Sequence, residues 1–298
     1  MPSKPLSKPL AHLTSKYLQS ASLQCGLPLT GSKPTLMSNL RAAAAAPTTL
    51  TPTSRILSID LGLRNLAFAL LTPTHTPKKQ HNLTLRAWTR LDLLPPDLNK
   101  PTHDFSPPSI AHLAVSLLHT HLLPLSPTHI LIERQRFRSG GAAPVLEWTL
   151  RVNALETALY AALATLRHLE VWEGRVVTGE EATRGKARAT GSKAMKLAKI
   201  RLVEASLREG KAVGLGTDEV REAVRRFLAA GESRGRKKGG KKAEGEGVET
   251  VETDDGKKRD DLADCLCQGV AWLQWQRNLE DLKKKEPWIL ESAEEMLE

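Results

Sequence analysis

The first 59 residues of this 298-residue chain contain no aspartate or glutamate, while they carry six lysines and arginines. The whole chain has three cysteines and no pair of C-x-x-C motifs, which argues against a disulfide-stapled secreted domain and against a structural zinc site. No run approaches the roughly 18 uncharged apolar residues of a membrane-spanning helix. Apolar residues make up 40% of the chain, enough to bury a core, so wholesale disorder is excluded as well.

The formal charge of +10 is spread unevenly along the chain. Residues 171–250 hold 19 basic and 12 acidic side chains, a net of +7, whereas residues 251–298 hold 7 basic and 13 acidic ones, a net of −6. A basic chain with a local concentration of acids is typical of a protein that binds polyanions and carries out metal chemistry on them. The alternative is a soluble protein that is mildly basic without such a role.

The acid-free start has two interpretations, an organelle transit peptide and a small folded module. Residues 12–41 predict two short helices, because Gly26 and Pro28 follow a leucine-rich stretch and Ser32 can cap a second one. This stretch resembles the SAP helix–extension–helix module, a nucleic-acid-binding element, and a plain helical hairpin is the alternative. Residues 42–54 then read as a linker, and only residues 1–11 remain as a candidate transit remnant.

The rest of the chain predicts an α/β domain over residues 55–280. Its pattern gives three strands, a helix, a strand, a helix, a strand and then only helices. Residues 231–258 lack apolar periodicity and are expected to be a solvated insertion, and residues 281–298 a charged tail. The expected strands are 55–62, 66–71, 83–93, 129–133 and 171–177, and the expected helices are 109–123, 145–168, 192–208, 218–230 and 259–280.

Acidic residues stand at three notable places in this pattern. Asp60 ends the first strand, Glu133 ends the fourth, and Asp260, Asp261 and Asp264 open the last helix. Asp264 shares a helical face with either of the other two, and crowded carboxylates are tolerated when a hard cation such as Mg²⁺ neutralises them. Each acid also has a plainer explanation: a turn residue, a partner for Arg134 or Arg136, or a favourable charge at a helix N-terminus.

These stretches together resemble the ribonuclease H-like superfamily and, within it, the fungal mitochondrial Holliday-junction resolvases related to bacterial RuvC. The resemblance covers roughly residues 12–280. It is carried by Ile59–Ala67, Ile132–Arg138, Trp148–Glu156 and Lys257–Asp264. It implies a ribonuclease H-like mixed sheet flanked by helices, with the SAP-like module in front.

The resemblance also implies an activity, a cofactor and a location. A homodimeric endonuclease would nick two strands of a four-way DNA junction symmetrically and leave ligatable 5′-phosphate ends, in the nucleoid of the mitochondrial matrix. It would use two Mg²⁺ ions, which Mn²⁺ can replace, and neither a nucleotide cofactor nor a membrane. Asp60 would bridge both metals, Glu133 and Asp264 would each hold one, and Asp260 or Asp261 would complete the set.

Basic residues around the acids are candidate DNA contacts, since phosphate contacts supply affinity without reading sequence. Their alternatives are charge balance for the acids and a solvated helix face. A lysine among Lys193, Lys196 and Lys199 is also a candidate assistant to the attacking water. The expected DNA-binding residues are Lys33, Arg64, Arg134, Arg136, Arg138, Arg184, Lys186, Arg188, Lys193 and Lys196.

The helix expected at 145–168 has apolar residues on two faces, so one can pack on the sheet while the other meets a second copy. The alternative is that both faces are covered within one chain. Three competing functions stay open: an actin-like ATPase, a nuclease for RNA/DNA hybrids, and a non-catalytic junction-binding protein. The ATPase would need a second D-x-G hairpin, and the only other D-G, Asp255-Gly256, lies in the low-complexity insertion.

Overall fold

A computed structural model describes most of the chain and divides it into two compact units, each treated separately below. The larger unit contains Thr51–Gly179 and Ala189–Gly269, and the smaller one contains the remainder. None of the described helices is long and apolar enough to cross a membrane. The described residues are 13–46, 50–74, 83–94, 104–133, 147–177, 192–210, 212–236 and 259–289.

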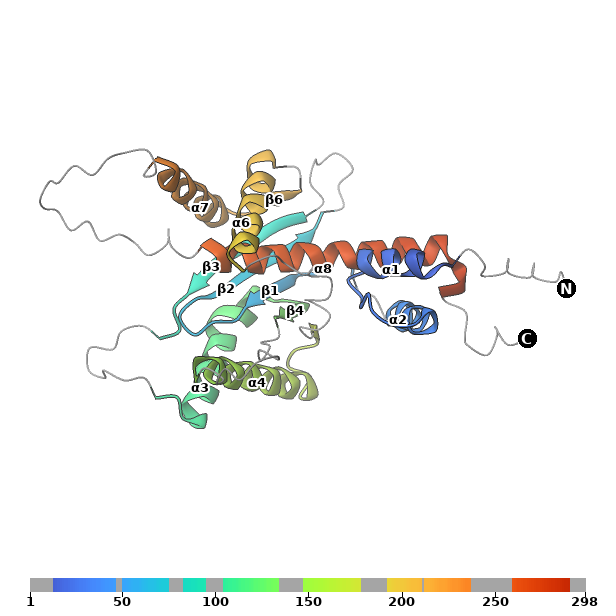
Figure 1. The fold of residues 1–298 in the computed structure, drawn as a ribbon. Coiled ribbons are helices and arrows are strands. Elements are labelled where there is room, and N and C mark those ends of the chain that lie inside the picture. Colours follow the sequence, from blue (N-terminus) through green and yellow to red (C-terminus); the bar gives the residue numbers. More distant parts are fainter. Residues whose placement is uncertain are drawn as a thin grey trace, which may run out of the picture. The chain divides into compact units, whose positions relative to one another are not determined.

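The larger unit is built on a six-stranded sheet with the strand order β5-β4-β1-β2-β3-β6 (Figure 1). Strand β2 runs antiparallel to its neighbours β1 and β3, whereas β4 and β5 extend the sheet parallel to β1, and β6 lies parallel to β3. The strands are β1 (Ile56–Asp60), β2 (Leu66–Pro73), β3 (Leu83–Leu91), β4 (His129–Ile132), β5 (Arg175–Val177) and β6 (Val213–Leu215).

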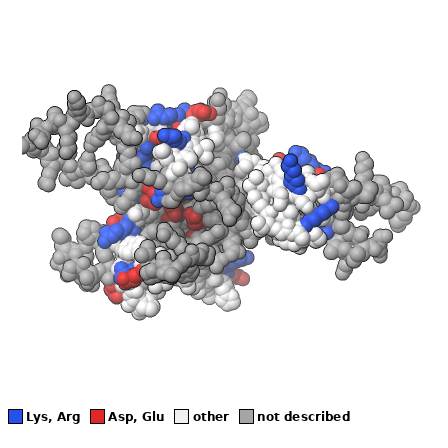
Figure 2. All heavy atoms as spheres, viewed as in Figure 1, with Lys and Arg blue, Asp and Glu red and all other residues white. Residues whose placement is uncertain are grey.

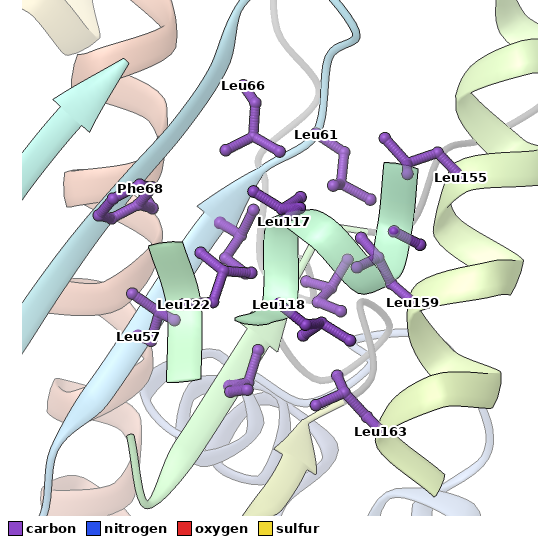
Figure 3. Packing of buried hydrophobic residues seen from close by; sticks show 14 of the residues in the cluster. Leu57, Leu61, Leu66, Phe68, Leu117, Leu118, Leu122, Leu155, Leu159 and Leu163 are labelled. Carbon is purple, nitrogen blue, oxygen red and sulfur yellow. The ribbon is translucent and has the colours of Figure 1, made fainter. Parts of the chain in front are cut away.

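Helices α3 (Pro107–Leu117) and α4 (Glu147–His168) cover one face of this sheet (Figure 1). Leucines from both helices interlock with Leu57, Leu61 and Phe68 in the main hydrophobic cluster, and all of these side chains are buried (Figure 3). The short β1 and β4 are buried along almost their whole length, as expected for strands covered on both faces.

Helices α6 (Ser192–Glu209), α7 (Asp218–Arg236) and α8 (Arg259–Lys285) belong to the other side of the sheet (Figure 1). Trp88 of β3 connects to two of them: its ring packs against Phe227 with the ring centroids 4.9 Å apart, and its indole N–H donates to the carbonyl of Leu262. Gly269 brings α8 close to β1, because a Cβ at this position would lie 3.1 Å from Cβ of the buried Ser58.

The smaller unit joins α1 (Ser15–Gln24) and α2 (Lys33–Ala45) to the second half of α8 and the short turn η5 (Pro287–Ile289). Thr14 and Ser32 cap the two N-terminal helices, which confirms the two short helices predicted there. Its core combines leucines of α1 and α2 with Leu279, Trp288 and Ile289. The stretch expected to be a charged tail is therefore a continued helix and a packed turn as far as residue 289.

Other boundaries also differ from the sequence prediction. The expected linker at 42–54 begins late, because α2 continues to Ala45. The helix expected at 109–123 is α-helical only to Leu117 and then passes through a π segment. It ends in a 3-10 turn that contains Pro124, which cannot donate a further helical hydrogen bond. Strand β5 begins at Arg175 rather than 171, after a turn in which Glu170 has φ 57°. The predicted insertion at 231–258 starts late, since α7 continues to Arg236.

Candidate active site

The parallel pairing of β1 and β4 brings two of the predicted acids to one edge of the sheet. Asp60 is the last residue of β1, and Glu133 directly follows β4. The backbone N–H of Glu133 donates to the carbonyl of Ile59 at 3.3 Å. Because the carboxyl ends of parallel strands meet at the same edge, the two carboxylates become neighbours although the sequence separates them widely.

The start of α8 supplies the other acids. Asp264 lies a little more than one helical turn before Gly269, at which α8 approaches Ser58, and Asp60 follows Ser58 on the same face of β1. This close contact between small residues fixes how near the helix lies to the strand. Figure 2 shows acidic side chains gathered between groups of lysine and arginine on the face drawn.

The charges of these acids act on one another. Burial is the largest cause of a pKa of Asp60 well above its usual range. The neighbouring carboxylates raise this pKa further, in the order Glu133, Asp264 and Asp261, and Lys199 offsets part of the effect. Burial and the adjacent charges likewise raise the pKa of Asp261 to about 6. The acidic cluster thus concentrates negative charge, and the nearby lysines and arginines among the described residues compensate this charge only in part.

Two lysines of α6 bond to acids of α8. Lys196 Nζ lies 2.6 Å from Asp260 Oδ2, and Lys199 Nζ lies 2.5 Å from Asp264 Oδ1. Burial acts to raise the pKa of Asp260, but the hydrogen bond and charge of Lys196 outweigh it and bring the pKa below its usual value. Asp260 is therefore turned toward α6, whereas the charge of Asp261 acts on Asp60, which favours Asp261 over Asp260 as a member of the acidic cluster.

Arg90 is a site residue that the sequence analysis missed. Its charge acts to lower the pKa of Asp261, and its guanidinium donates to the side-chain oxygen of Asn65. The register of the sheet explains its position: Asp60 pairs with Ala67, which in turn pairs with Arg90, so the three lie in one row. The hairpin pattern could have indicated this row, because it follows directly from how β1, β2 and β3 align.

The donor chemistry of the cluster suits a hard divalent cation. Asp60, Glu133, Asp261 and Asp264 all offer carboxylate oxygens, the ligands that Mg²⁺ prefers. The raised pKa of Asp60 reflects burial first and then repulsion by the other acids, and a bound cation would offset both. Within the described ranges, no three His, Cys, Asp or Glu side chains converge as one ready-made metal site. Instead, lysines hold Asp260 and Asp264.

The predicted DNA-binding residues fall into two groups. Lys33 is exposed at the start of α2, and Lys196 bonds to Asp260. Arg64 contacts Asp92 at 3.5 Å and the carbonyl of Leu94 at 3.3 Å, so it ties the loop after β1 to the end of β3. The others lie outside the described residues, or have side chains that do: Arg134, Arg136, Arg138, Arg184, Lys186, Arg188 and Lys193.

A family model for "Mitochondrial resolvase Ydc2 / RNA splicing MRS1" matches residues 56–282, which include every acid of the cluster. The chain belongs to this family. The name of this family covers both a resolvase and an RNA splicing protein. Membership alone therefore does not distinguish a nuclease from a splicing protein, and the clustered carboxylates are the additional observation that favours a nuclease. The matched region begins with β1 and ends within α8, and therefore contains the whole six-stranded sheet.

Two relatives are similar to this chain over different lengths. Cruciform cutting endonuclease 1 from Schizosaccharomyces pombe, a mitochondrial protein, is 39% identical over 153 residues, which is 51% of this chain and 56% of the relative. The match thus spans little more than half of that protein. The crystal structure of a yeast mitochondrial Holliday junction resolvase, Ydc2, is 25% identical with a TM-score of 0.59, covering 92% of this chain and 98% of its own. This likeness confirms the ribonuclease H-like fold class.

Proposed function

We propose that this chain is a structure-selective endonuclease that resolves four-way DNA junctions during recombination of mitochondrial DNA, in the nucleoid of the matrix. The observation that carries the proposal is the cluster of Asp60, Glu133, Asp261 and Asp264, drawn from three separate elements of a resolvase-family fold. A protein that only binds junctions has no use for repelling carboxylates, because their burial and mutual repulsion cost stability. The similarity to a cruciform cutting endonuclease supports the same substrate.

The four clustered acids would hold two Mg²⁺ ions, which Mn²⁺ can replace. The metal would activate the attacking water and stabilise the leaving oxygen of the phosphodiester. Asp60 would be the central ligand, because the charges of Glu133, Asp264 and Asp261 all act on its carboxylate. Asp260 precedes Asp261 on α8, and its carboxylate is bonded to Lys196 as that of Asp264 is bonded to Lys199.

Contacts to the DNA would come from basic residues around the cluster and from the smaller unit. The two arginine- and lysine-rich stretches at 134–138 and 184–193 would follow the phosphate backbone. The hairpin of α1 and α2 is proposed to act as the SAP-like module, with Lys33 at the exposed start of α2. Phosphate contacts of this kind would give affinity for the junction without reading its sequence.

A homodimer would supply the second cut. A four-way junction has approximate two-fold symmetry, and one chain offers one acidic cluster, so a two-fold symmetric pair is the simplest arrangement. Helix α4 supports this role: Leu155 and Leu159 are buried in the core, whereas Leu150 on another face is 50% exposed and Ala154 beside it is also exposed. That outward apolar face is the proposed contact between copies.

The test is a cleavage assay on gels with labelled DNA and Mg²⁺. The full chain is expected to convert a mobile four-way junction into nicked duplexes whose ends a ligase can seal, and to leave a linear duplex of the same sequence intact. An RNA/DNA hybrid in a parallel reaction tests the competing nuclease activity. Cutting of the hybrid in preference to the junction would contradict the proposal, as would junction binding with no Mg²⁺-dependent cutting.

A further inference from the structure

The contact between α6 and α8 places ammonium groups on the acids beside the proposed catalytic cluster. Lys196 and Lys199 stand three residues apart on α6, and their partners Asp260 and Asp264 stand four apart on α8, so both pairs form along one line of contact between two helix faces. The Lys196 side chain is 54% exposed, while the Lys199 side chain is 21% exposed and its charge acts on Asp60.

An ammonium group and a divalent cation compete for the same oxygens. Lysine is a single positive charge on a flexible stem, and its three N–H donors use the carboxylate lone pairs that a metal would need. Lys199 and a bound cation would compete for Asp264, because this residue both bonds to Lys199 and contributes to the raised pKa of Asp60. A cation that binds Asp264 through Oδ1 must therefore displace Lys199.

The helices can stay together while the lysines leave. Arg259, at the start of α8, pairs with Glu204 of α6, and its side chain is only 5% exposed. Its guanidinium also lies over the ring of Phe227 in α7, 4.2 Å from the ring centroid. This buried contact anchors α6 independently of Lys196 and Lys199, so the long lysine side chains can rotate away without movement of the helix.

We propose that Lys196 and Lys199 exchange partners during the reaction: they bond to Asp260 and Asp264 before a divalent cation binds, and contact the phosphates of bound DNA afterwards. Both lysines would then be positioning residues that couple cation binding to DNA binding. Because such coupling is reciprocal, DNA must tighten cation binding by the factor by which the cation tightens DNA binding. The inference rests on the proposed nuclease function and adds a regulation of its site.

Calorimetric titration of the full chain with Ca²⁺, which takes carboxylate ligands as Mg²⁺ does, tests the competition directly. Without DNA, Lys199→Met is expected to bind Ca²⁺ about tenfold more tightly than the wild type, since one competing ion pair is gone. Lys196→Met should show a smaller gain in the same direction. Lys284→Met is the surface control, because Lys284 pairs with Asp281 in the smaller unit, and it should leave the affinity unchanged.

A second titration separates exchange of partners from loss of positive charge. Arg90→Met also removes a charge near Asp261, but it does so from β3, where the guanidinium donates to the side-chain oxygen of Asn65. With a four-way junction present, the wild type and Arg90→Met are expected to gain Ca²⁺ affinity, whereas both lysine variants should lose most of this gain. An equal gain in all variants would overturn the inference.

The outcomes distinguish this inference from the function on which it rests. If the wild type cuts junctions but both lysine variants keep its Ca²⁺ affinity and its coupling to DNA, the exchange is wrong and the nuclease assignment stands. If the wild type neither binds Ca²⁺ nor cuts a junction, the proposed function fails and the inference fails with it. Lys196→Met keeps the test decisive should Lys199→Met fold poorly, because Lys196 is the more exposed of the two.

Discussion

The indole ring of Trp275 occupies the space that a side chain at Gly26 would need. A Cβ at Gly26 would lie 2.3 Å from Cδ2 of Trp275, and Gly26 has a φ of +68°. Glycine is thus required twice at the end of α1, for its backbone conformation and for the close approach of α8 within the smaller unit. The same residue marks the end of the first helix in the sequence.

Gly26→Ala is expected to lower the stability of the smaller unit by about 2–4 kcal/mol, from left-handed backbone strain and displacement of the indole. Gly210→Ala is the matched control, because Gly210 has φ +63° with nothing within 4 Å of an added Cβ. It should show the strain cost alone. Thermal unfolding followed by tryptophan fluorescence measures both, and equal losses would show that the Trp275 contact is unimportant.

Asp60→Asn should separate DNA binding from cleavage. The change removes one carboxylate from the centre of the cluster and leaves the basic residues untouched, so a junction should still be shifted on a gel. Cutting should fall by about a hundredfold or more, because bound metals contribute several kcal/mol to stabilising the transition state. Time courses with excess enzyme measure this, and an undiminished rate would exclude Asp60 from the chemistry.

His129 predicts a loss of stability in mild acid. It is buried at the start of β4 with its Nδ1 2.9 Å from Thr128 Oγ1, and burial, followed by the charge of Arg175, lowers its pKa from 6.5 to about 4. Since the folded state favours the neutral ring, its contribution is complete above pH 6.5 and is lost as the pH falls from 6.5 toward 4.

His129→Gln should therefore flatten the fall in melting temperature between pH 7 and pH 4.5, although it starts from a lower value because a packed ring is lost. The same change at the exposed His112 should leave the pH profile unchanged. Parallel wild-type and His129→Gln profiles would rule out this histidine as the source of acid sensitivity.

Removal of residues 1–46 should weaken junction binding but preserve hydrolysis, because every proposed metal ligand lies after residue 59. The structure adds a cost, since the deletion strips the cover from Leu279, Trp288 and Ile289. The truncated chain is accordingly expected to bind a hydrophobic dye and to self-associate more readily. Complete loss of cutting in a folded truncation would place α1 or α2 in the active site.

Ala154→Arg should break the proposed dimer, because it puts a charged side chain on the outward face of α4. Light scattering at micromolar concentration should give a mass near 32.7 kDa for the variant and about twice that for the wild type. Ala111→Arg, on the exposed side of α3, is the control and should remain dimeric. A wild-type mass near that of one chain would contradict a stable dimer in the absence of DNA.

The acids at the strand ends could be placed from sequence because a strand and the acid that ends it are visible within a few consecutive residues. Asp60 and Glu133 each end an apolar run, and parallel neighbours deliver such ends to the same edge. By contrast, β6 has only three residues, too few to establish a period. The ion-pair partner of Asp264 could not be predicted from the sequence either. Lys199 contacts it because α6 packs against α8, and the residue spacing within one helix does not show which helices pack together.

The smaller unit shows a second limit of prediction from sequence, because it is built from segments at the two ends of the chain. Helical periodicity at residues 13–40 indicates an apolar face but not its partner. That partner comes from the far end of the sequence: the Tyr17 hydroxyl donates to a Glu286 carboxylate oxygen at 2.7 Å. The composition of residues 281–298 predicts a charged tail, yet Trp288 and Ile289 within it are buried. Two apolar residues among many charges are enough to anchor a segment.

The boundary between the two units falls inside α8, between Gly269 and Val270, and not in a loop. The same unbroken helix begins with the acids of the site and ends in the core of the smaller unit. The N-terminal hairpin is therefore no self-contained module, because Leu279, Trp288 and Ile289, among the last described residues, form part of its core. A change in evolution that added, removed or replaced the smaller unit would therefore have had to alter both ends of the gene together.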